Sequence, residues 1–481
     1  MCATDTKPRE QLGGHVEKRD APDSSIALSE HLAAVSYDDL PERVASYTKE
    51  AIADTIACII AGTGGEEFAA VTDLLTQWGG NPSSTVIGTN LRTAPDNAVL
   101  AMGCAVHQYD FDDTHDTAVC HPSPASFMPA LAFAEEKGGV SGRDIITAVA
   151  LGNDVTSRVA LSITGRLNSY SWIRASIAGI FGATAASAKI LGLDAAQHRH
   201  ALGLALPQAA GTLASLHNPG SSVRSIRDGL CYRSGALAAA LAARGVRGDQ
   251  EVFDGPYGVF QTYFRGEYDP AAMTAEIGER WETVNVSLKP WPSCRHLHGT
   301  LTAVIGILEE EKLSFEQVDH VMLHVGDVNF DRSRPVRTGM VPEQRIDLLC
   351  NMPFAVGAAL RHGNLPLKLY RDGAMADDVV TNAVPKVKWM FDPEQNGSWT
   401  LEPGYVELFT TDGRHFTRKV RRALGHPENP MSEARQRRKM RDCCAAAAKP
   451  IGEGRADAIF DAVMALDGMS DVRELSKLLT N

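Results

Sequence analysis

A fourteen-residue stretch, DFDDTHDTAVCHPS (residues 110–123), gathers side chains that could bind a metal ion or transfer protons. It holds four aspartates, two histidines, two threonines and one cysteine. Carboxylates suit Mg²⁺, imidazoles suit transition metals, and a histidine can also give or take a proton near neutral pH. The residue types therefore leave three kinds of site open: a diphosphate site, a transition-metal site and a proton-transfer site.

The diphosphate site is the sharpest generic match. Asp112, Asp113 and Asp116 fit the DDxxD pattern with which terpene cyclases hold Mg²⁺ and diphosphate. Those enzymes need a second motif, NDxxSxxxE, well downstream. The stretch NDVTSRVAL from Asn153 has Leu161 in place of the final acid, and it begins too close to the first motif. A transition-metal site is equally weak, because the sequence has neither HExxH nor a second histidine cluster.

The proton-transfer site needs positive charges from elsewhere in the chain. A base, an acid and several cations around one pocket could remove a proton beside a carboxylate and expel a β-substituent. Four basic residues lie in or beside Gly-, Ser- and Pro-rich connections, where loops often meet an active site: Arg224, Arg227, Lys289 and Arg295. Their spacing alone does not separate them from ordinary solvated side chains.

The elements that must position these residues form three successive segments. From Ile26 to about Arg280, apolar residues at three- and four-residue spacing predict helices, and Ala- and Gly-rich stretches predict buried helices with closely approaching backbones. Residues 284–420 contain four strand-like stretches with period two, TVNVSLKPWP, VDHVMLHVG, VPKVKWMFD and GYVELFTTDGRHFTRKV, and the last of them contains Asp412–Gly413, a hairpin signal. Helices are predicted between them over HGTLTAVIGILEEEKL and QRIDLLCNMPFAVGAALRHG. Helical periodicity returns after residue 420, and we expect that last segment to dock on the first.

Composition narrows the class of protein. The chain has 481 residues, 44% hydrophobic and 22% charged, as expected for a globular protein with a large core. A net charge of −12 argues against nucleic acid as a partner, and the apolar stretches are shorter than the roughly 20 residues of a membrane span. Residues 1–25 are predicted to be a disordered tail, neither a secretory signal nor a mitochondrial transit peptide. Nine cysteines without a CxxC pair indicate free thiols, so we expect a cytoplasmic protein.

Several segments, in order along the chain, resemble the MmgE/PrpD family, which includes 2-methylcitrate dehydratases and cis-aconitate decarboxylases. The most specific is HQYDFDDTHDTAVCHPSPASFMPAL, similar to the family's His-x-x-Asp-Phe-Asp-Asp-Thr followed by His-Pro-Ser. VRSIRDGLCYRSGALAAALAARG resembles its basic helix start and SLKPWPSCRHLHG its lysine loop. HPENPMSEARQRRKMRDC resembles its C-terminal segment. The resemblance runs from about Ile26 to Leu479.

This resemblance implies a fold that is mostly α with an α+β part. A large helical domain would be built from residues 26–283 and 421–481, and a smaller α+β lid domain, residues 284–420, would be inserted between them. The resemblance also implies a homodimer, catalysis without a metal or an organic cofactor, and a small polycarboxylate as the substrate.

Carried over one residue at a time, the resemblance implies that Asp110, Thr114, His121 and Lys289 are catalytic residues. His121 would transfer protons, and Lys289 would hold a carboxylate or stabilise an enolate-like intermediate. The implied substrate-binding residues are Arg224, Arg227, Cys294 and His298.

Three pocket positions depart from the decarboxylases that the chain resembles. Arg224 replaces a lysine, Ile173 or Arg174 replaces a histidine, and Asp327 or Val328 replaces a tyrosine of the lid. An arginine binds a carboxylate through a planar fork, unlike a lysine. The sequence therefore favours dehydration of a 2-alkylcitrate, such as 2-methylcitrate. The alternatives are cis-aconitate decarboxylation to itaconate, epimerisation of a small dicarboxylic acid, and polycarboxylate binding without turnover.

Overall fold

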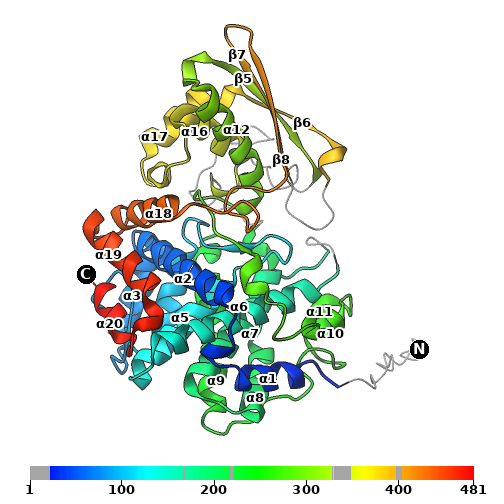
Figure 1. Ribbon diagram of the computed structural model, residues 1–481, viewed down its shortest axis with the longest axis vertical. Coiled ribbons are helices and arrows are strands. Elements are labelled where there is room, and N and C mark those ends of the chain that lie inside the picture. The colour runs from blue at the N-terminus through cyan, green and yellow to red at the C-terminus, as the bar shows by residue number, and fades with distance from the viewer. Residues whose placement is uncertain are drawn as a thin grey trace, which may run out of the picture.

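The computed structural model describes residues 22–165, 169–216, 221–327, 329, 348–396 and 403–480. It has a large part made of helices and a smaller part with a four-stranded sheet, which we call the helical body and the sheet unit (Figure 1). The prediction of a mostly α fold with an α+β part is confirmed. Most of the predicted tail, residues 1–21, lies outside the described residues. Asp23 is buried, and its carboxylate accepts hydrogen bonds from the backbone N–H groups of Phe253 and Asp254.

The helical body draws its helices from both ends of the chain. The first segment supplies α1 (Ser25–Ala34), α2 (Glu42–Gly62), α3 (Glu66–Trp78), α4 (Pro95–Val106), α5 (Pro122–Lys137), α6 (Gly142–Ser162), α7 (Arg174–Leu191), α8 (Ala195–Ala205), α9 (Val223–Ala242), α10 (Val259–Phe264) and α11 (Pro270–Thr274). The last segment supplies α18 (Glu433–Ala445), α19 (Glu453–Met464) and α20 (Arg473–Leu478). Both α18 and α19 pack on α2, so the last segment docks on the first as expected (Figure 1).

Small residues bring the central helices close together, as the Ala- and Gly-rich stretches predict. A Cβ added to Gly103 on α4 would lie 2.4 Å from the Cα of Gly229 on α9. One added to Gly182 on α7 would lie 1.8 Å from the hydroxyl oxygen of Thr156 on α6. In an interior packed this closely, an added methyl group would have to push the two helix backbones apart. The ends of α4 and α9 are therefore fixed relative to each other. Helix α9 carries Arg224 and Arg227 of the predicted site, and the loop that follows α4 carries Asp110.

The sheet unit is a mixed sheet with helices on it. Its strands are β5 (Val318–Val325), β6 (Val387–Phe391), β7 (Gly404–Thr410) and β8 (His415–Val420), in the order β6-β5-β7-β8 with β5 and β6 parallel. Its helices are α12 (His298–Glu311), α16 (Met352–His362) and α17 (Gly373–Asp378). Buried residues alternate along β7, and α12 packs on that strand. The predicted Asp-Gly hairpin joins β7 to β8, with Gly413 at φ +88°.

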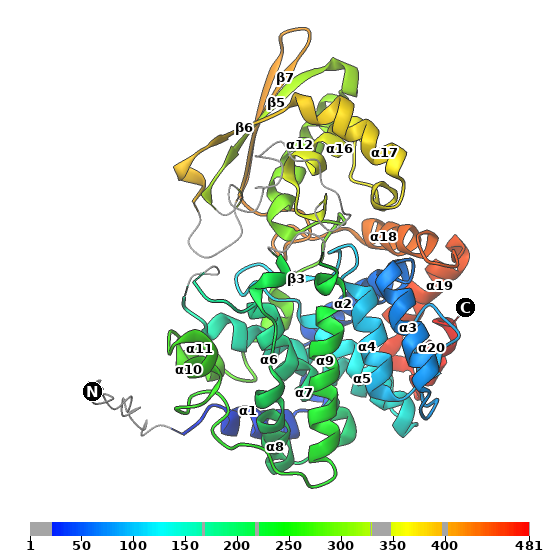
Figure 2. The same cartoon turned by 180° about the vertical axis from the view of Figure 1, so that it is seen from behind.

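Two predicted elements differ from the structure. The stretch TVNVSLKPWP contributes no strand to the sheet, because its only strand, β4 (Val286–Ser287), pairs antiparallel with β3 (Thr114–His115). This two-stranded ribbon lies where the helical body meets the sheet unit (Figure 2). The helix predicted over QRIDLLCNMPFAVGAALRHG begins at Met352, where Asn351 caps it, and residues 344–347 lie outside the described part. A further ribbon, β1 (Ser84–Thr85) with β2 (Arg92–Thr93), lies in the helical body.

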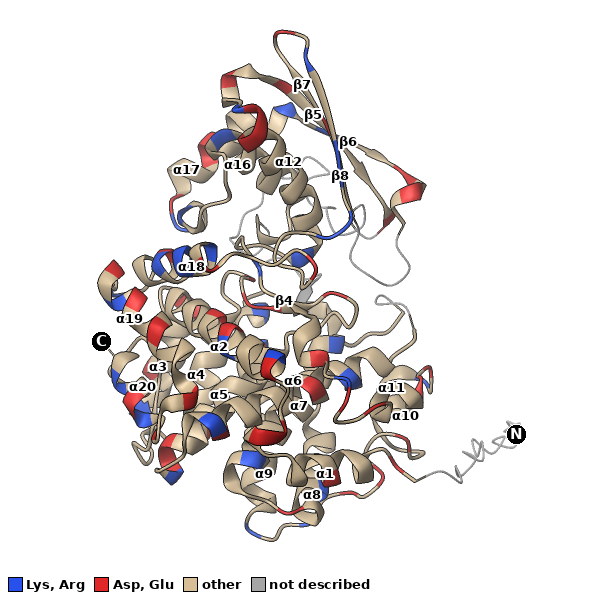
Figure 3. Ribbon diagram, viewed as in Figure 1, with Lys and Arg blue, Asp and Glu red and all other residues tan. Residues whose placement is uncertain are grey.

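Acidic and basic residues are interspersed over both parts of the protein (Figure 3). Along the described chain, no helix combines the length and apolar character that crossing a bilayer requires.

Helix α18 carries several basic residues, but Lys439 is buried. Its ammonium group donates to the carboxylate of Asp54 on α2 at 2.6 Å and to the backbone carbonyls of Phe111 and Lys289. The last chain segment therefore ties the aspartate-rich loop to the lysine loop.

Candidate active site

The aspartate-rich stretch is the connection between α4 and α5. The ribbon of β3 and β4 holds it against the lysine loop, with Thr114 opposite Ser287 and His115 opposite Val286. This pairing brings together two segments that lie far apart in the sequence. Asp110 and Val119 have φ values of +47° and +53°, a region that costs energy for residues other than glycine. The loop thus keeps a strained backbone around its buried side chains.

Asp110 is buried between two cations. The ammonium group of Lys289 donates to its carboxylate at 2.6 Å and to its backbone carbonyl at 2.8 Å. The guanidinium of Arg224, in the first turn of α9, contacts the other carboxylate oxygen. Burial alone would raise the pKa of Asp110, but Lys289 and Arg224 hold it well below its usual range. The Asp110 side chain is therefore a fixed anion rather than a proton carrier.

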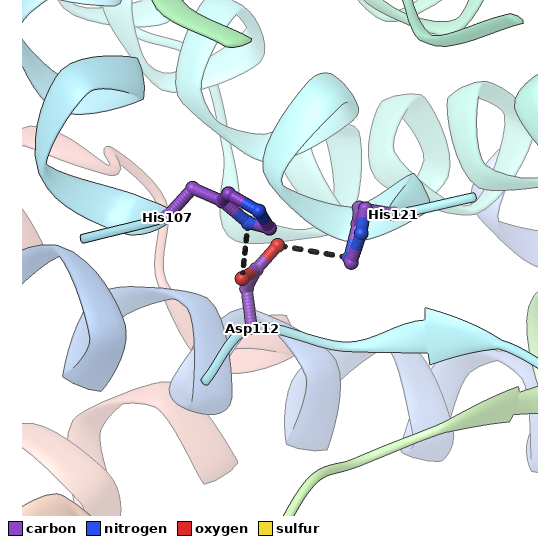
Figure 4. A group of neighbouring side chains, drawn as sticks. All are labelled: His107, Asp112 and His121. Carbon is purple, nitrogen blue, oxygen red and sulfur yellow. Dashed lines mark hydrogen bonds and ion pairs between the residues drawn. The ribbon is translucent and has the colours of Figure 1, made fainter. Parts of the chain in front are cut away.

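Asp112 lies between two imidazoles (Figure 4). One carboxylate oxygen is 2.8 Å from Nδ1 of His107, and the other is 3.1 Å from Nδ1 of His121. The two rings lie edge to face with centroids 4.9 Å apart. Burial opposes the charge on Asp112, but the two histidines lower its pKa well below the usual range. Asp112 therefore stays an anion that both imidazoles share.

The contacts of His121 fix which ring nitrogen carries a proton. Nδ1 is 2.6 Å from the backbone carbonyl oxygen of Asp113, and a carbonyl oxygen can only accept. The proton therefore sits on Nδ1, and Nε2 is left for chemistry. Burial acts to lower the pKa of His121, but Asp112 outweighs it and raises that pKa above its ordinary value. The ring is thus biased toward the imidazolium form, which carries a proton on Nε2 as well.

The other two aspartates of the stretch have partners of their own. The carboxylate of Asp113 accepts from the backbone N–H of Ser123 at 3.1 Å, and burial raises its pKa to about 7. The carboxylate of Asp116 accepts two hydrogen bonds from Arg295, at 2.9 and 3.0 Å. The acids that match DDxxD are thus directed to separate partners, and the diphosphate hypothesis lacks the convergent carboxylates that it requires. In the cluster of His107, Asp112 and His121, Nδ1 of His121 donates to a backbone carbonyl, so this nitrogen is not available to ligate a metal ion together with Asp112.

A buried cavity of about 90 Å³ lies beside these groups. A cavity of that size holds several water molecules, at roughly 10–15 Å³ for each. Seven of the eight predicted site residues line it: Asp110, Thr114, His121, Arg224, Arg227, Lys289 and Cys294. The structure therefore brings these seven residues, from segments that lie far apart along the chain, to one cavity.

His298 is the exception, because it is not among the residues that line the cavity. It is buried at the start of α12, with Nε2 at 3.1 Å from the hydroxyl of Ser293 and Nδ1 at 3.4 Å from a guanidinium nitrogen of Arg295. Burial and the charge on Arg295 lower its pKa well below the ordinary value. The structure thus places His298 beside Arg295, outside the set of residues that line the cavity.

Sequence reasoning missed two residues of the site, His107 and Asp112. His107 lines the cavity and shares Asp112 with His121, although it ends α4 as an ordinary helix cap would. Asp112 was considered only as a metal ligand. At the position of the missing histidine, Ile173 and Arg174 both line the cavity. Of the two residues at the tyrosine position, Asp327 is exposed and does not line the cavity, and residue 328 lies outside the described part.

Comparison with known proteins places the chain in a family. Residues 26–271 match the MmgE/PrpD N-terminal domain and residues 291–466 match the MmgE/PrpD C-terminal domain. The chain therefore belongs to the MmgE/PrpD family, as the resemblance predicts, and is a lyase.

Its curated relatives match along nearly their whole length. The cis-aconitate decarboxylase-like protein oryM of Aspergillus oryzae is 27% identical over 466 residues, covering 92% of this chain and 94% of that protein. The cis-aconitate decarboxylase of Aspergillus terreus is 26% identical over 471 residues, covering 92% and 93%. That of Mus musculus is 26% identical over 458 residues, covering 92% and 90%.

Proposed function

We propose that this lyase removes CO₂ from cis-aconitate or a close unsaturated tricarboxylate, without a cofactor. The curated relatives carry decarboxylase names, which favours this reaction over the dehydration that the sequence alone favours. The observation that carries the proposal is the anchoring of His121. Its Nδ1–H donates to the Asp113 carbonyl, and the Asp112 carboxylate lies 3.1 Å from the same nitrogen as an ion-pair partner, so a protonated ring presents Nε2–H as a proton donor. Decarboxylation needs such a donor at carbon, whereas dehydration begins with a base.

The residues that line the cavity can supply the proton and the positive charges that decarboxylation needs. When the carboxylate on the saturated carbon of cis-aconitate leaves as CO₂, the electrons of its bond form a new double bond. The electrons of the old double bond take a proton from Nε2 of His121, and itaconate results. The intermediate is an allylic carbanion conjugated with the carboxylate on the carbon that takes the proton, so its charge spreads onto the oxygens of that carboxylate. Lys289 and Arg224 are buried cations that would stabilise that charge.

Arg224 has an N–H group that could donate a hydrogen bond to the substrate. Its Nη2 contacts Asp110, but its Nε is buried without a hydrogen-bond partner among the described residues. Leaving a buried donor unpaired costs about 1–3 kcal/mol, and more for a charged group. A substrate carboxylate in the cavity would satisfy this group. Asp110 would thus position two cations, and Thr114, whose hydroxyl lies 3.5 Å from Nδ1 of His121, would help to hold the ring.

Dehydration of a 2-alkylcitrate is the second candidate, and His107 is the observation that favours it. Elimination of water needs a base for the proton and an acid for the hydroxyl group. His107 and His121 line the same cavity and share one carboxylate, so one imidazole could accept a proton while the other donates one.

One NMR time course in D₂O separates the two reactions. The purified enzyme is incubated with cis-aconitate and, separately, with 2-methylcitrate, and released CO₂ is trapped and counted. We expect itaconate and equimolar CO₂ from cis-aconitate, with one deuterium in the methylene group and none in the vinyl group. A vinylic product from 2-methylcitrate without CO₂ would establish the dehydratase instead. Recovery of both acids unchanged, by an enzyme that binds them, would contradict both candidates.

A further inference from the structure

The arginine and lysine side chains that line the cavity differ in whether they have a carboxylate partner. Five arginine and lysine side chains line it, and four of them have a carboxylate partner. Lys289 and Arg224 share Asp110, Arg227 pairs with Asp228 at 2.7 Å, and Arg295 pairs with Asp116. The fifth is Arg174, for which the described residues offer no ion pair.

Arg174 is 9% exposed, and its guanidinium Nη2 donates to the backbone carbonyl of Gly165 at 2.8 Å. Burial lowers its pKa, and no carboxylate is among the groups that oppose this effect. Moving a charged side chain out of water without a counter-ion costs several kcal/mol. An anion that enters the cavity would recover part of that cost.

The backbone around Arg174 is fixed. It is the first residue of α7, so the positive end of the helix dipole lies at the same point. The preceding residues pair with another loop of the body: the N–H of Ile173 donates to the carbonyl of Gly211, and the N–H of Leu213 donates to the carbonyl of Ser171, both at 2.8 Å. This pairing forms one wall of the cavity and holds the guanidinium in place before any substrate binds.

We propose that Arg174 binds one carboxylate of the substrate and makes the site selective for tricarboxylates over dicarboxylates. The charge balance of the cavity supports this assignment, because its five cationic side chains face only three partner carboxylates. This balance leaves two positive charges for the substrate, so a preference for a third carboxylate depends on where the carboxylates bind. An acid whose two carboxylates are held by Lys289 and Arg224 would leave Arg174 unpaired, and a tricarboxylate would not. The inference rests on the proposed function for the identity of the substrate, but the binding that it predicts does not require turnover.

Two unreactive acids test the selectivity directly. Tricarballylate has three carboxylates on a saturated chain, and glutarate is the same chain without the middle carboxylate. Calorimetry gives the ratio of their affinities for the wild type, Arg174→Gln and Arg174→Lys. We expect Arg174→Gln to weaken tricarballylate binding about 10- to 100-fold and glutarate binding less than about 2-fold, because one charge-assisted hydrogen-bonded pair is lost. Arg174→Lys should restore part of the difference, since it keeps the charge but not the planar fork.

A matched control and a second measurement distinguish this role from a structural one. Arg233→Gln removes a guanidinium from α9 that pairs with Asp96 outside the cavity, and it should leave both affinities unchanged. The uncompensated charge of Arg174 should also destabilise the empty protein. Arg174→Met is therefore expected to raise the melting temperature without ligand and to reduce the increase that tricarballylate produces. The proposal would be overturned if Arg174→Met lowered the melting temperature and left the stabilisation by tricarballylate undiminished. It would also be overturned if Arg174→Gln weakened the binding of tricarballylate and of glutarate by the same factor.

The same variants separate this inference from the proposed function. If the wild type leaves cis-aconitate unchanged but its preference for tricarballylate collapses in Arg174→Gln, the decarboxylase proposal fails and the assignment of Arg174 stands. If the wild type makes itaconate and Arg174→Gln does so with an unchanged KM, the assignment fails and the decarboxylase stands.

Discussion

Two hollows flank the β3–β4 ribbon, and they differ in how their charges are paired. Thr114 lines the cavity and the next residue, His115, lines the second hollow, which we call the groove, because successive residues of a strand point to opposite faces. Arg295 lines both. The groove is the larger of the two, about 380 Å³ against about 90 Å³. Volume alone would therefore point to the groove as the site.

Charge pairing points the other way. In the groove, Glu282 pairs with Arg280 and His115, and Arg422 pairs with the exposed Glu428. In the cavity, Asp110 is shared by two cations and Arg174 has no ion pair along the described chain. Buried charges that the protein itself does not balance are typical of sites that receive a charged ligand. In this protein, buried charge without a full set of partners distinguishes the candidate active site, and the volume of the hollow does not.

The largest effect is expected from the imidazole that faces the cavity. His121→Ala should lower kcat by about 10²- to 10⁴-fold, because it removes the proposed proton donor. His426→Ala, which removes a histidine from the groove, is the matched control and should change kcat less than about 2-fold. Steady-state kinetics on both variants, with circular dichroism to verify folding, checks the contrast. Equal effects of the two changes would remove the distinction between the hollows.

The next effect concerns stability. Asp110→Asn leaves Lys289 and Arg224 buried without a counter-ion, and breaking a buried pair costs about 3–5 kcal/mol. Because the pKa of Asp110 is depressed in the folded state, its contribution is complete above the unfolded pKa of about 3.9 and is lost as the pH falls through the folded pKa. The difference in denaturant midpoint between wild type and variant should therefore be constant from pH 8 to 5 and narrow in stronger acid.

Asp457→Asn is the control for that measurement. It breaks an exposed pair with Arg441, at 2.7 Å, and should cost less than about 1 kcal/mol. A similar cost for Asp110→Asn would mean that the two cations of the cavity do not depend on that carboxylate.

A smaller effect on rate, but a clear one on pH dependence, is expected from Asp112→Asn. Asp112 outweighs burial and raises the pKa of His121, so removing its charge should lower that pKa. If the imidazolium is the acid, activity is present below this pKa and is lost as the pH rises through it. The alkaline limb of kcat/KM against pH should thus move to lower pH in Asp112→Asn, with kcat reduced by about 10-fold at the optimum. An alkaline limb that stays in place would assign it to another group.

Sequence patterns within a few residues predicted most helices and strands. They could not predict which strands pair when the partners lie far apart in the sequence. The period-two stretches of β5 and β7 and the Asp412–Gly413 turn carry their signal within a few residues, and all three are present. β4 was misassigned to the sheet because its partner, β3, lies in a distant segment, and no local pattern records that pairing.

The site shows the same limit more sharply. Family resemblance located Asp110, His121 and Lys289, whose roles remain a proposal, because they fall within recognisable motifs. It brought Arg174 forward only as one of two residues at the position of a missing histidine and gave it no role, since an arginine at a helix start is usually solvated. What distinguishes Arg174 is that it has no ion pair among the described residues, and that property exists only after folding.

The smallest effect is expected in the groove itself. Arg421 is exposed there, so Arg421→Gln should change stability by no more than about 0.5 kcal/mol. Its kcat/KM should stay within about 2-fold of the wild type, because an exposed charge is screened by water and salt. Kinetics at low and at physiological ionic strength measures this. A KM that rises strongly at low salt only would show that the groove steers the anionic substrate toward the cavity, and the two hollows would then act in sequence rather than apart.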